Sequence, residues 1–289
     1  MPDFRATSVA GVPPLNEVVV ETLDGPELMA VSGGTMATTQ RKSGGTSAVI
    51  RLPPGGKEWL PVAPGAVVLP HPRGFVVVES DSSAYVIDAS GNTLRQIDPF
   101  PFNSGAVQSH LREGTTLALA EASDGIGTKL HLVGLDERDR WVTNPVAGNR
   151  DDNGPVSGAS VVAADGSLYV VLGTIDDSGQ GAMKLGEVAR SSLEISWRVF
   201  GGVDRVLFDP SGVTASDSWV VVAARDRISL LPLDEDRQLI SDSLSGDIPV
   251  TEGVSVVTTA ASGLVVGWTG SRAAPAEDGH WWALDADRL

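Results

Sequence analysis

A short pattern recurs six times along the chain and limits its fold more than any other feature. In each copy an apolar strand ends at an Asp or a turn, and a second strand with an aromatic or aliphatic residue follows within a few residues. The copies end their first strand at these residues: Leu52, Ile87, Leu135, Val188, Leu233 and Leu284. Their mean spacing of about 46 residues matches a four-stranded propeller blade of ~40–50 residues.

The segment 74–97 shows how one copy is built. Residues 75–78 are apolar and mostly β-branched, residues 80–83 are turn formers, and residues 85–87 form a second apolar run. Residues 88–92 then turn the chain into a third strand at 94–97. This order predicts three consecutive antiparallel strands, which are most of one blade.

These patterns predict an all-β fold, a single six-bladed β-propeller, with seven blades as the alternative. The last copy ends after its third strand, whereas a surplus strand at residues 16–22 precedes the first copy. Because an unpaired edge strand promotes aggregation, we expect the N-terminal strand to complete the last blade. Residues 1–15, with Pro13 and Pro14, are predicted to be a linker, and residues 16–289 the propeller.

The strand that ends in Asp, turns through a Gly-containing loop and is followed by Trp resembles the repeat of the quinoprotein-like, PQQ-type β-propellers. The segment 87–91 contains the first half of this repeat, the strand that ends in Asp and the Gly-containing turn. Asp136 and Trp141 form a shortened version of the repeat, and Trp59 and Trp197 occupy the Trp position in two other copies. What the resemblance implies is the scaffold alone, so we expect no cofactor. Each of these Trp rings is predicted to pack between neighbouring blades.

Charge and composition exclude several classes of function. The chain carries 37 acidic and 21 basic residues, a formal charge of −16, and no Lys/Arg cluster, which argues against nucleic acid as a partner. It has no cysteine, so disulfides, thiolate metal sites and Cys nucleophiles are excluded. No apolar run approaches the ~20 residues that span a bilayer, so we expect no membrane insertion of this chain.

Recognisable catalytic motifs are missing. The four histidines are scattered, and HExxH, GxSxG, Walker A and GxGxxG do not occur. The short acidic runs at 136–139 and 234–236 are interpreted as turn chemistry, and His71, in Pro-His-Pro-Arg-Gly, as part of a solvated turn. Whether a metal binds elsewhere stays open, since a propeller can gather distant residues at its axis.

Loop lengths indicate which edge of the blades carries function. The turns between third and fourth strands are short, whereas the long connections fall mostly at the opposite edge, and long loops on a rigid scaffold are the usual place for binding. These connections hold the candidate partner-binding residues: Asp124, Asp151, Asp152, Asp176, Asp177, Glu277 and Asp278. Carboxylates gathered on one surface attract a cation or a basic partner. Acidic loops kept only for solubility are the alternative.

The functional hypothesis is therefore a non-catalytic binding scaffold. We expect it to be extracytoplasmic, exported or membrane-tethered, and to dock a protein or cell-envelope partner through the acidic loops. The alternative is a metal-dependent hydrolase or lactonase with an axial site, since Asp24-Gly25-Pro26 and Asn153-Gly154 resemble motifs of the six-bladed calcium-dependent lactonases. In that family Glu is expected where Asp24 stands.

Overall fold

The computed structural model describes residues 7–8, 30–32, 35–41, 47–52, 57–123, 128–148, 156–175, 180–204, 208, 212–224, 227–243, 254–259, 265–270 and 280–284. Within these ranges the chain has no α-helix, and a 3-10 turn, η1, spans Ser104–Ala106. The all-β prediction is confirmed for this part of the chain.

The strands follow one another along the chain, joined by connections of unequal length. Their bounds are β1 Thr7–Ser8, β2 Ala30–Ser32, β3 Thr35–Arg41, β4 Ser47–Leu52, β5 Lys57–Val62, β6 Val67–His71, β7 Gly74–Val78, β8 Ala84–Ile87, β9 Thr93–Ile97, β10 Val107–His110, β11 Leu117–Ser123 and β12 Thr128–Leu135. The later strands are β13 Trp141–Gly148, β14 Val156–Ala164, β15 Ser167–Ile175, β16 Gln180–Val188, β17 Ile195–Asp204, β18 Val213–Ala215, β19 Trp219–Ala224, β20 Arg227–Pro232, β21 Ile240–Ser243, β22 Val254–Thr259, β23 Val265–Gly270 and β24 His280–Leu284.

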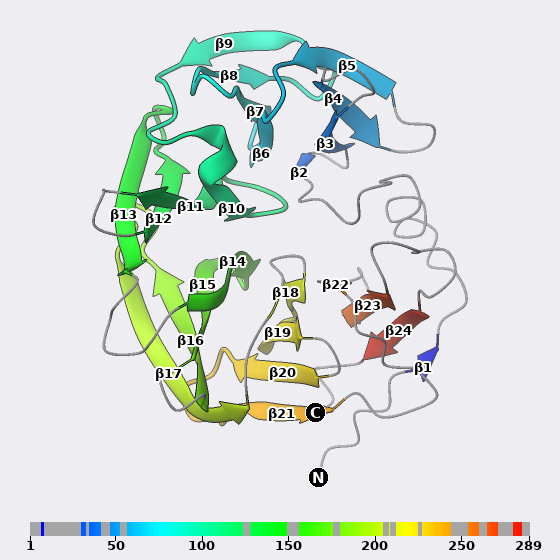
Figure 1. Ribbon diagram of the computed structural model, residues 1–289, viewed down its shortest axis with the longest axis vertical. Helices are drawn as coiled ribbons and strands as arrows, with labels where there is room; N and C mark the ends of the chain where they lie inside the picture. Colours follow the sequence, from blue (N-terminus) through cyan, green and yellow to red (C-terminus); the bar gives the residue numbers. More distant parts are fainter. Residues whose placement is uncertain are drawn as a thin grey trace. The chain divides into compact units, whose positions relative to one another are not determined.

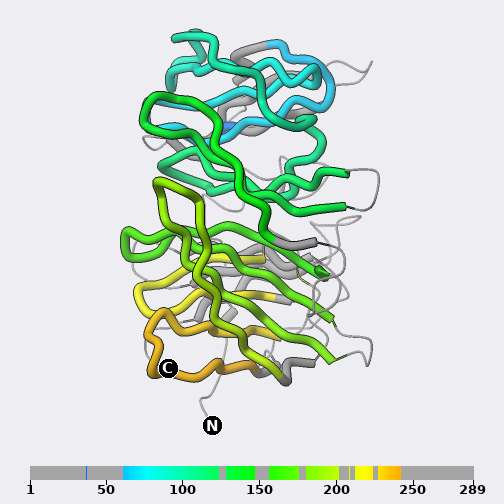
Figure 2. Tube along the Cα trace, turned by 90° about the vertical axis from the view of Figure 1, so that its left-hand side faces the viewer, coloured from blue at the N-terminus to red at the C-terminus, as the bar shows by residue number. Residues whose placement is uncertain are grey.

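These strands form four-stranded antiparallel sheets in which chain neighbours pair. The sheets are β2–β5, β6–β9, β10–β13, β14–β17, β18–β21, and β22–β24 with β1 (Figure 1). Figure 2 shows the chain turning back between β14 and β15 and again between β16 and β17, in its green to yellow-green part. Four-stranded meanders of this kind are the blades of β-propellers, so the fold is of the β-propeller type.

The six sequence anchors mark the third strands. Each anchor is the last residue of the third strand of its sheet, except Leu233, which directly follows the last residue of β20. The strands predicted within 74–97 are also found, as β7, β8 and β9, and they pair antiparallel as expected. The sequence period therefore predicted the sheets correctly.

The chain divides into two compact units. Unit 1 comprises Met1–Pro26, Arg150–Val188 and Ser196–Leu289, and unit 2 comprises Glu27–Asn149 and Ala189–Ile195. Three sheets, β2–β5, β6–β9 and β10–β13, belong to unit 2. The sheets β18–β21 and β22–β24 with β1, and nearly all of sheet β14–β17, belong to unit 1.

In unit 2, strand β7 packs into a hydrophobic cluster on each of its two faces. Phe75 and Val77 belong to a buried cluster shared with sheet β2–β5, and Val76 and Val78 to a second cluster shared with sheet β10–β13. All four side chains have no exposed surface. Because alternate residues of a strand point to opposite faces, a strand between two sheets must be apolar throughout. This explains the unbroken apolar run in the sequence.

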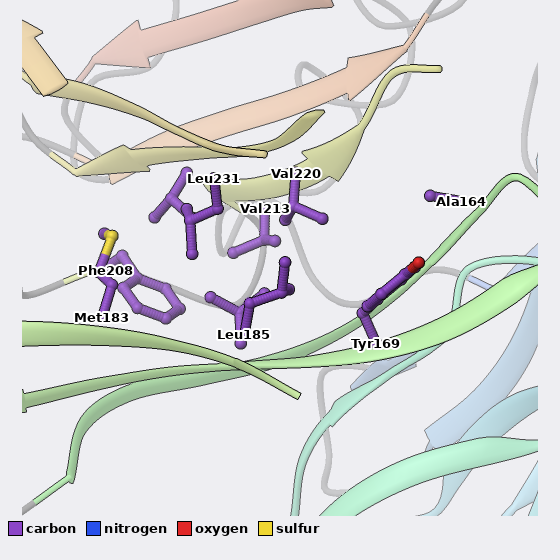
Figure 3. Packing of buried hydrophobic residues seen from close by; sticks show 10 residues of the cluster. Ala164, Tyr169, Met183, Leu185, Phe208, Val213, Val220 and Leu231 are labelled. Carbon is purple, nitrogen blue, oxygen red and sulfur yellow. The ribbon is translucent and has the colours of Figure 1, made fainter. Parts of the chain in front are cut away.

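In unit 1, sheets β14–β17 and β18–β21 pack against each other in the same way. Met183 and Leu185 of β16 meet Val220 of β19 and Leu231 of β20, and the ring of Tyr169 lies beside them (Figure 3). Such a side chain contributes about 1.5–3 kcal/mol when fully buried. The apolar contact between consecutive sheets thus stabilises each unit.

A strand from the N-terminal part of the chain completes the last sheet. Thr7 pairs with Ala283 and Ser8 with Trp282, so β1 takes the place next to β24. The sequence pattern predicts residues 16–22 in this place, and these lie outside the described residues. The strand found there belongs instead to the segment 1–15, expected to be a linker. A two-residue pairing rests on backbone groups and leaves no apolar pattern in the sequence.

Candidate functional site

An aspartate-capped turn recurs between the third and fourth strands of the sheets. Asp88 Oδ1 accepts hydrogen bonds from the backbone amides of Ser90 and Asn92, at 2.8 and 2.9 Å. Asp136 Oδ1 accepts from the amides two and four residues later, again at 2.8 and 2.9 Å. Asp234 accepts from the amide two residues later, at 3.0 Å. The prediction that the acidic runs at 136–139 and 234–236 serve turn chemistry is confirmed for these two caps.

These hydrogen bonds favour the ionised carboxylates. Bonds from the side chain and then the backbone of Asn92 hold the pKa of Asp88 below its usual value. The backbone amide of Arg140, followed by its guanidinium, does the same for the pKa of Asp136. Both aspartates are charged at neutral pH and act as turn caps.

Asp139 occupies the left-handed position of its turn, where the preceding sheet has glycine. Gly91 has φ +86° and Asp139 has φ +56°. Each donates its backbone amide to the carbonyl of the capping aspartate, at 3.0 and 2.9 Å. A left-handed conformation is uncommon outside glycine, although Asp tolerates it better than most residues. A side-chain role therefore explains Asp139 at this position.

That role is to hold an ion-pair cluster formed by His71, Arg73, Arg95 and Asp139, here called the Asp139 cluster. His71 Nε2 lies 3.2 Å from Asp139 Oδ1, and Arg73 Nη2 lies 2.7 Å from Asp139 Oδ2. The guanidinium of Arg95 forms an ion pair with the same Oδ2. Asp139 is 9% exposed and His71 only 4%. The cluster links β6, the β6–β7 turn and β9 to the β12–β13 turn, all within unit 2.

Hydrogen bonding fixes the proton on His71. The backbone amide of Arg73 donates to His71 Nδ1 at 3.1 Å, so Nδ1 carries no proton in the neutral ring. Nε2 is then the protonated nitrogen and donates to Asp139. Burial, with smaller contributions from Arg73 and Arg95, lowers the pKa of His71 to about 4. The imidazole is neutral at physiological pH, and Asp139 receives three donors.

The structure corrects two interpretations from the sequence. His71 does adjoin a tight turn, since it pairs with Gly74 across residues 72–73, but it is buried and not solvated. Asp139 does more than turn chemistry, because its carboxylate links two sheets. The signal that sequence reasoning missed is an acidic residue at the glycine position of a capped turn. Its partner could not be identified from the sequence because it lies 68 residues away.

The prediction that the Trp rings pack between neighbouring sheets is confirmed for Trp141. Trp59, Trp141 and Trp197 all lie on the fourth strands of their sheets. The ring of Trp141 packs edge-on against Phe100, with centroids 5.0 Å apart, and its Nε1 donates to the Asp98 carbonyl at 2.8 Å. These contacts join Trp141 to the connection that follows the preceding sheet, which confirms its place between blades.

Two acidic residues at the opposite edge of sheet β6–β9 have structural partners. Glu79 accepts hydrogen bonds from the amide of Ala63 at 2.9 Å and from the hydroxyl of Tyr85 at 2.8 Å. Burial, and then Glu79, raises the pKa of Tyr85. Asp81 accepts from the amide of Ser83 at 2.9 Å. These carboxylates, between the second and third strands, stabilise the turn.

The seven candidate partner-binding residues lie outside the described residues. The strands that flank them do establish where their connections start. Ser123 pairs with Thr128 and Lys129 with Gly148, so the connections containing Asp124 and Asp151 both leave sheet β10–β13 at one end. In sheet β14–β17, Val156 pairs with Thr174 and Ile175 with Gly181, so the connection containing Asp151 enters this sheet beside the start of the connection containing Asp176. Within each sheet, the acidic segments thus start from a common edge.

Two further observations concern metals and membranes. In the part of the chain that the structure describes, no group of three or more His, Asp or Glu side chains is placed to hold a metal ion. The same part contains no helix long and apolar enough to cross a membrane.

Neither a protein-family model nor a curated protein matches the sequence. Among solved structures, the chain is similar to the WD40 domain of SCAP from fission yeast, with 10% identity and a TM-score of 0.39 over 84% of this chain. It spans 66% of that structure, just under two thirds. It is also similar to the fungal Aleuria aurantia lectin, a six-bladed β-propeller, with 12% identity and a TM-score of 0.44 over 84% of this chain and 88% of that one. At these TM-scores neither similarity bears on blade number or function.

Proposed function

We propose that the chain is a non-catalytic binding scaffold, a closed six-bladed β-propeller of quinoprotein-like type. The pairing of β1 with β24 supports closure, because it occupies an edge that would otherwise be open. The recurring capped turn, followed by Trp141 in one sheet, supports the quinoprotein-like repeat. In this proposal the sheets provide a rigid frame, and the loops between them bind.

The binding surface in this proposal is the acidic edge from which the long connections leave. The observation that carries it is the shared starting edge of the connections containing Asp151, Asp152, Asp176 and Asp177, seen in the pairings Val156–Thr174 and Ile175–Gly181. Neighbouring carboxylates raise each other's energy, and a basic partner relieves that repulsion. The partner class is therefore a basic protein or a basic cell-envelope component, bound in a salt-dependent manner.

A charge-matched pair of variants tests this surface within unit 1. The loop variant replaces Asp151, Asp152, Asp176 and Asp177 by Asn. The control variant removes four exposed carboxylates from turns at the other edge of the sheets, through these substitutions: Asp165→Asn, Asp217→Asn, Glu235→Gln and Asp236→Asn. Both variants gain the same net charge, so any difference between them reports position.

Binding to an immobilised lysine-rich peptide is measured at low and high salt, and capture from an envelope fraction is measured in parallel. The proposal expects the loop variant to lose most of the salt-sensitive binding, while the control variant keeps it. Equal loss in both variants would mean that net charge alone governs binding and would reject the surface.

The proposed location is outside the cytoplasm, with the chain exported or tethered to a membrane. The absence of cysteine and the turn-rich, acidic composition are compatible with this location. Fractionation of the source cells, with the chain detected by antibody, tests it directly. Recovery in the cytoplasmic fraction alone would reject it.

A further inference from the structure

Two arginines of the Asp139 cluster remain open to solvent. Arg73 is 55% exposed and Arg95 is 41% exposed, although both contact the same carboxylate oxygen. A guanidinium has five N–H donors in a planar fork. Among the residues that the structure describes, the side chain of Arg73 has no acceptor other than Asp139, and neither does that of Arg95. Most of their donors are therefore available to a ligand.

The cluster carries a net positive charge in an otherwise acidic chain. Two guanidiniums face one carboxylate, and His71 is used as a neutral donor. Arg73 and Arg95 carry two positive charges and share the single negative charge of Asp139, which leaves one positive charge in excess. This excess charge lies on the solvent-exposed arginines, so it attracts an anion most strongly at low ionic strength.

We propose that Arg73 and Arg95 form a binding site for the oxyanion group of a small ligand, a carboxylate or a phosphate. Asp139 holds both guanidiniums near one point, so part of their side-chain freedom is already lost before a ligand arrives. An oxyanion bound by the remaining N–H groups accepts charge-assisted hydrogen bonds from two forks. Asp139 and His71 are positioning residues, and the two arginines contact the ligand.

This site is separate from the proposed acidic surface. Asp139 lies in the β12–β13 turn, whereas the connection containing Asp124 leaves from the other end of β12. The two surfaces have opposite charge and select opposite ligands. Failure of one proposal therefore leaves the other standing.

The test uses full-length protein labelled with 15N-arginine, in which each exposed arginine gives a separate Nε–Hε signal in NMR spectra. Inorganic phosphate and acetate are added in separate titrations at constant ionic strength. The expected result is a saturable shift of the Arg73 and Arg95 signals, with phosphate, acetate or both. A response to phosphate alone assigns a phosphate ligand, and a response to acetate assigns a carboxylate. No shift of these two signals, or an equal shift of all exposed arginines, overturns the proposal.

Variants then establish that the two forks act together. Arg95→Gln is expected to weaken binding about tenfold or more, since a charged hydrogen-bonding group is lost. Arg95→Lys keeps the charge without the fork and is expected to lose most of the affinity. Arg138→Gln is the matched control, because Arg138 is exposed in the same turn as Asp139. If Arg138→Gln weakens binding as much as Arg95→Gln, a diffuse field explains the binding and the site is rejected. Circular dichroism confirms that each variant is folded, and the wild-type titration does not depend on them.

Discussion

His71 and Asp139 form a hydrogen bond of 3.2 Å between two different sheets of unit 2, although 68 residues separate them in the chain. One residue ends the first strand of sheet β6–β9, and the other lies in the last turn of sheet β10–β13. Their bond, with the two ion pairs to Arg73 and Arg95, adds a polar link to the apolar core that these sheets share. The contribution of this link to stability can be measured.

Asp139→Asn should lower the free energy of unfolding by about 1.5–3 kcal/mol, the range for losing hydrogen bonds to a charged group. Asn accepts the left-handed backbone conformation, so the change removes charge without adding backbone strain. Urea denaturation followed by circular dichroism measures the difference. The arginines are half-exposed and regain water, which limits the loss.

The matched control is Asp234→Asn in the equivalent turn of sheet β18–β21. Asp234 is 58% exposed and its nearest cation, Arg237, is 3.9 Å away. An exposed pair of this kind contributes about 0–1 kcal/mol. If the two substitutions cost the same, the burial of Asp139 has no energetic consequence and the cluster is not a structural link.

His71 should make stability depend on pH in mildly acidic solution. The ordinary pKa of a His side chain is 6.5, whereas the pKa of His71 is about 4 in the folded chain, where the ring faces Asp139, Arg73 and Arg95. Between these values the unfolded chain binds a proton and the folded chain does not. Stability therefore falls as the pH drops from about 6.5 to about 4 and levels off below that range, where both states are protonated.

His71→Gln separates this effect from the titration of the carboxylates. The variant is expected to be less stable at pH 7, because the ring and its two hydrogen bonds are lost. Its stability should change less between pH 6.5 and 4 than that of the wild type. Unfolding free energies at several pH values, compared pairwise, give the difference. Parallel curves for the two proteins would show that His71 does not titrate in this window.

The sheets could be predicted from the sequence because their signal is local. Each third strand ends at an apolar residue next to turn formers, as Ile87 does before Asp88, and hydrophobic alternation needs only neighbouring residues. Strand β7 is apolar at every position because both of its faces are buried, and that pattern is also visible in the sequence.

The Asp139 cluster could not be predicted from the sequence because its residues come together only in the folded chain. His71 and Asp139 meet only after two sheets pack, and no spacing in the chain encodes that contact. The N-terminal strand was also misplaced for a physical reason. Thr7 and Ser8 pair through backbone groups, which every residue type can do, so the sequence gives no sign of the pairing. Residues 16–22, in contrast, contain several β-branched residues, which have a high β-strand propensity.

Gly74 should not tolerate a side chain. Its φ is +142°, and a Cβ at this position would lie 2.1 Å from the carbonyl oxygen of Ile87 and 2.8 Å from the Cα of Asp88. Both obstacles are backbone, which cannot move without breaking the pairing of β7 with β8. We expect Gly74→Ala to yield little soluble, folded protein.

Gly114→Ala is the control for backbone strain alone. Its φ is +89°, and no atom lies within 4 Å of the position a Cβ would take. Its cost should be limited to about 1–2 kcal/mol for a left-handed non-glycine residue. The soluble yield of each variant, and its thermal unfolding where protein is obtained, decide the matter: equal yields and equal midpoints would show that the close approach at Gly74 is unimportant.

The last prediction concerns the pairing of β1 with β24, on which closure of the proposed ring depends. Replacing both Thr7 and Ser8 by Pro removes their backbone N–H groups, whereas replacing both by Ala keeps them. Because Thr7 and Ser8 are successive residues facing Ala283 and Trp282, only one of their two N–H groups points toward β24, so the Pro variant loses one donor to β24 and weakens this edge. At about 0.5–1.5 kcal/mol per lost hydrogen bond, the Pro variant should unfold at a clearly lower temperature than the Ala variant and aggregate more readily. Scanning calorimetry and light scattering measure the two effects. Identical behaviour of the Pro and Ala variants would show that this pairing neither stabilises the last sheet nor closes a ring.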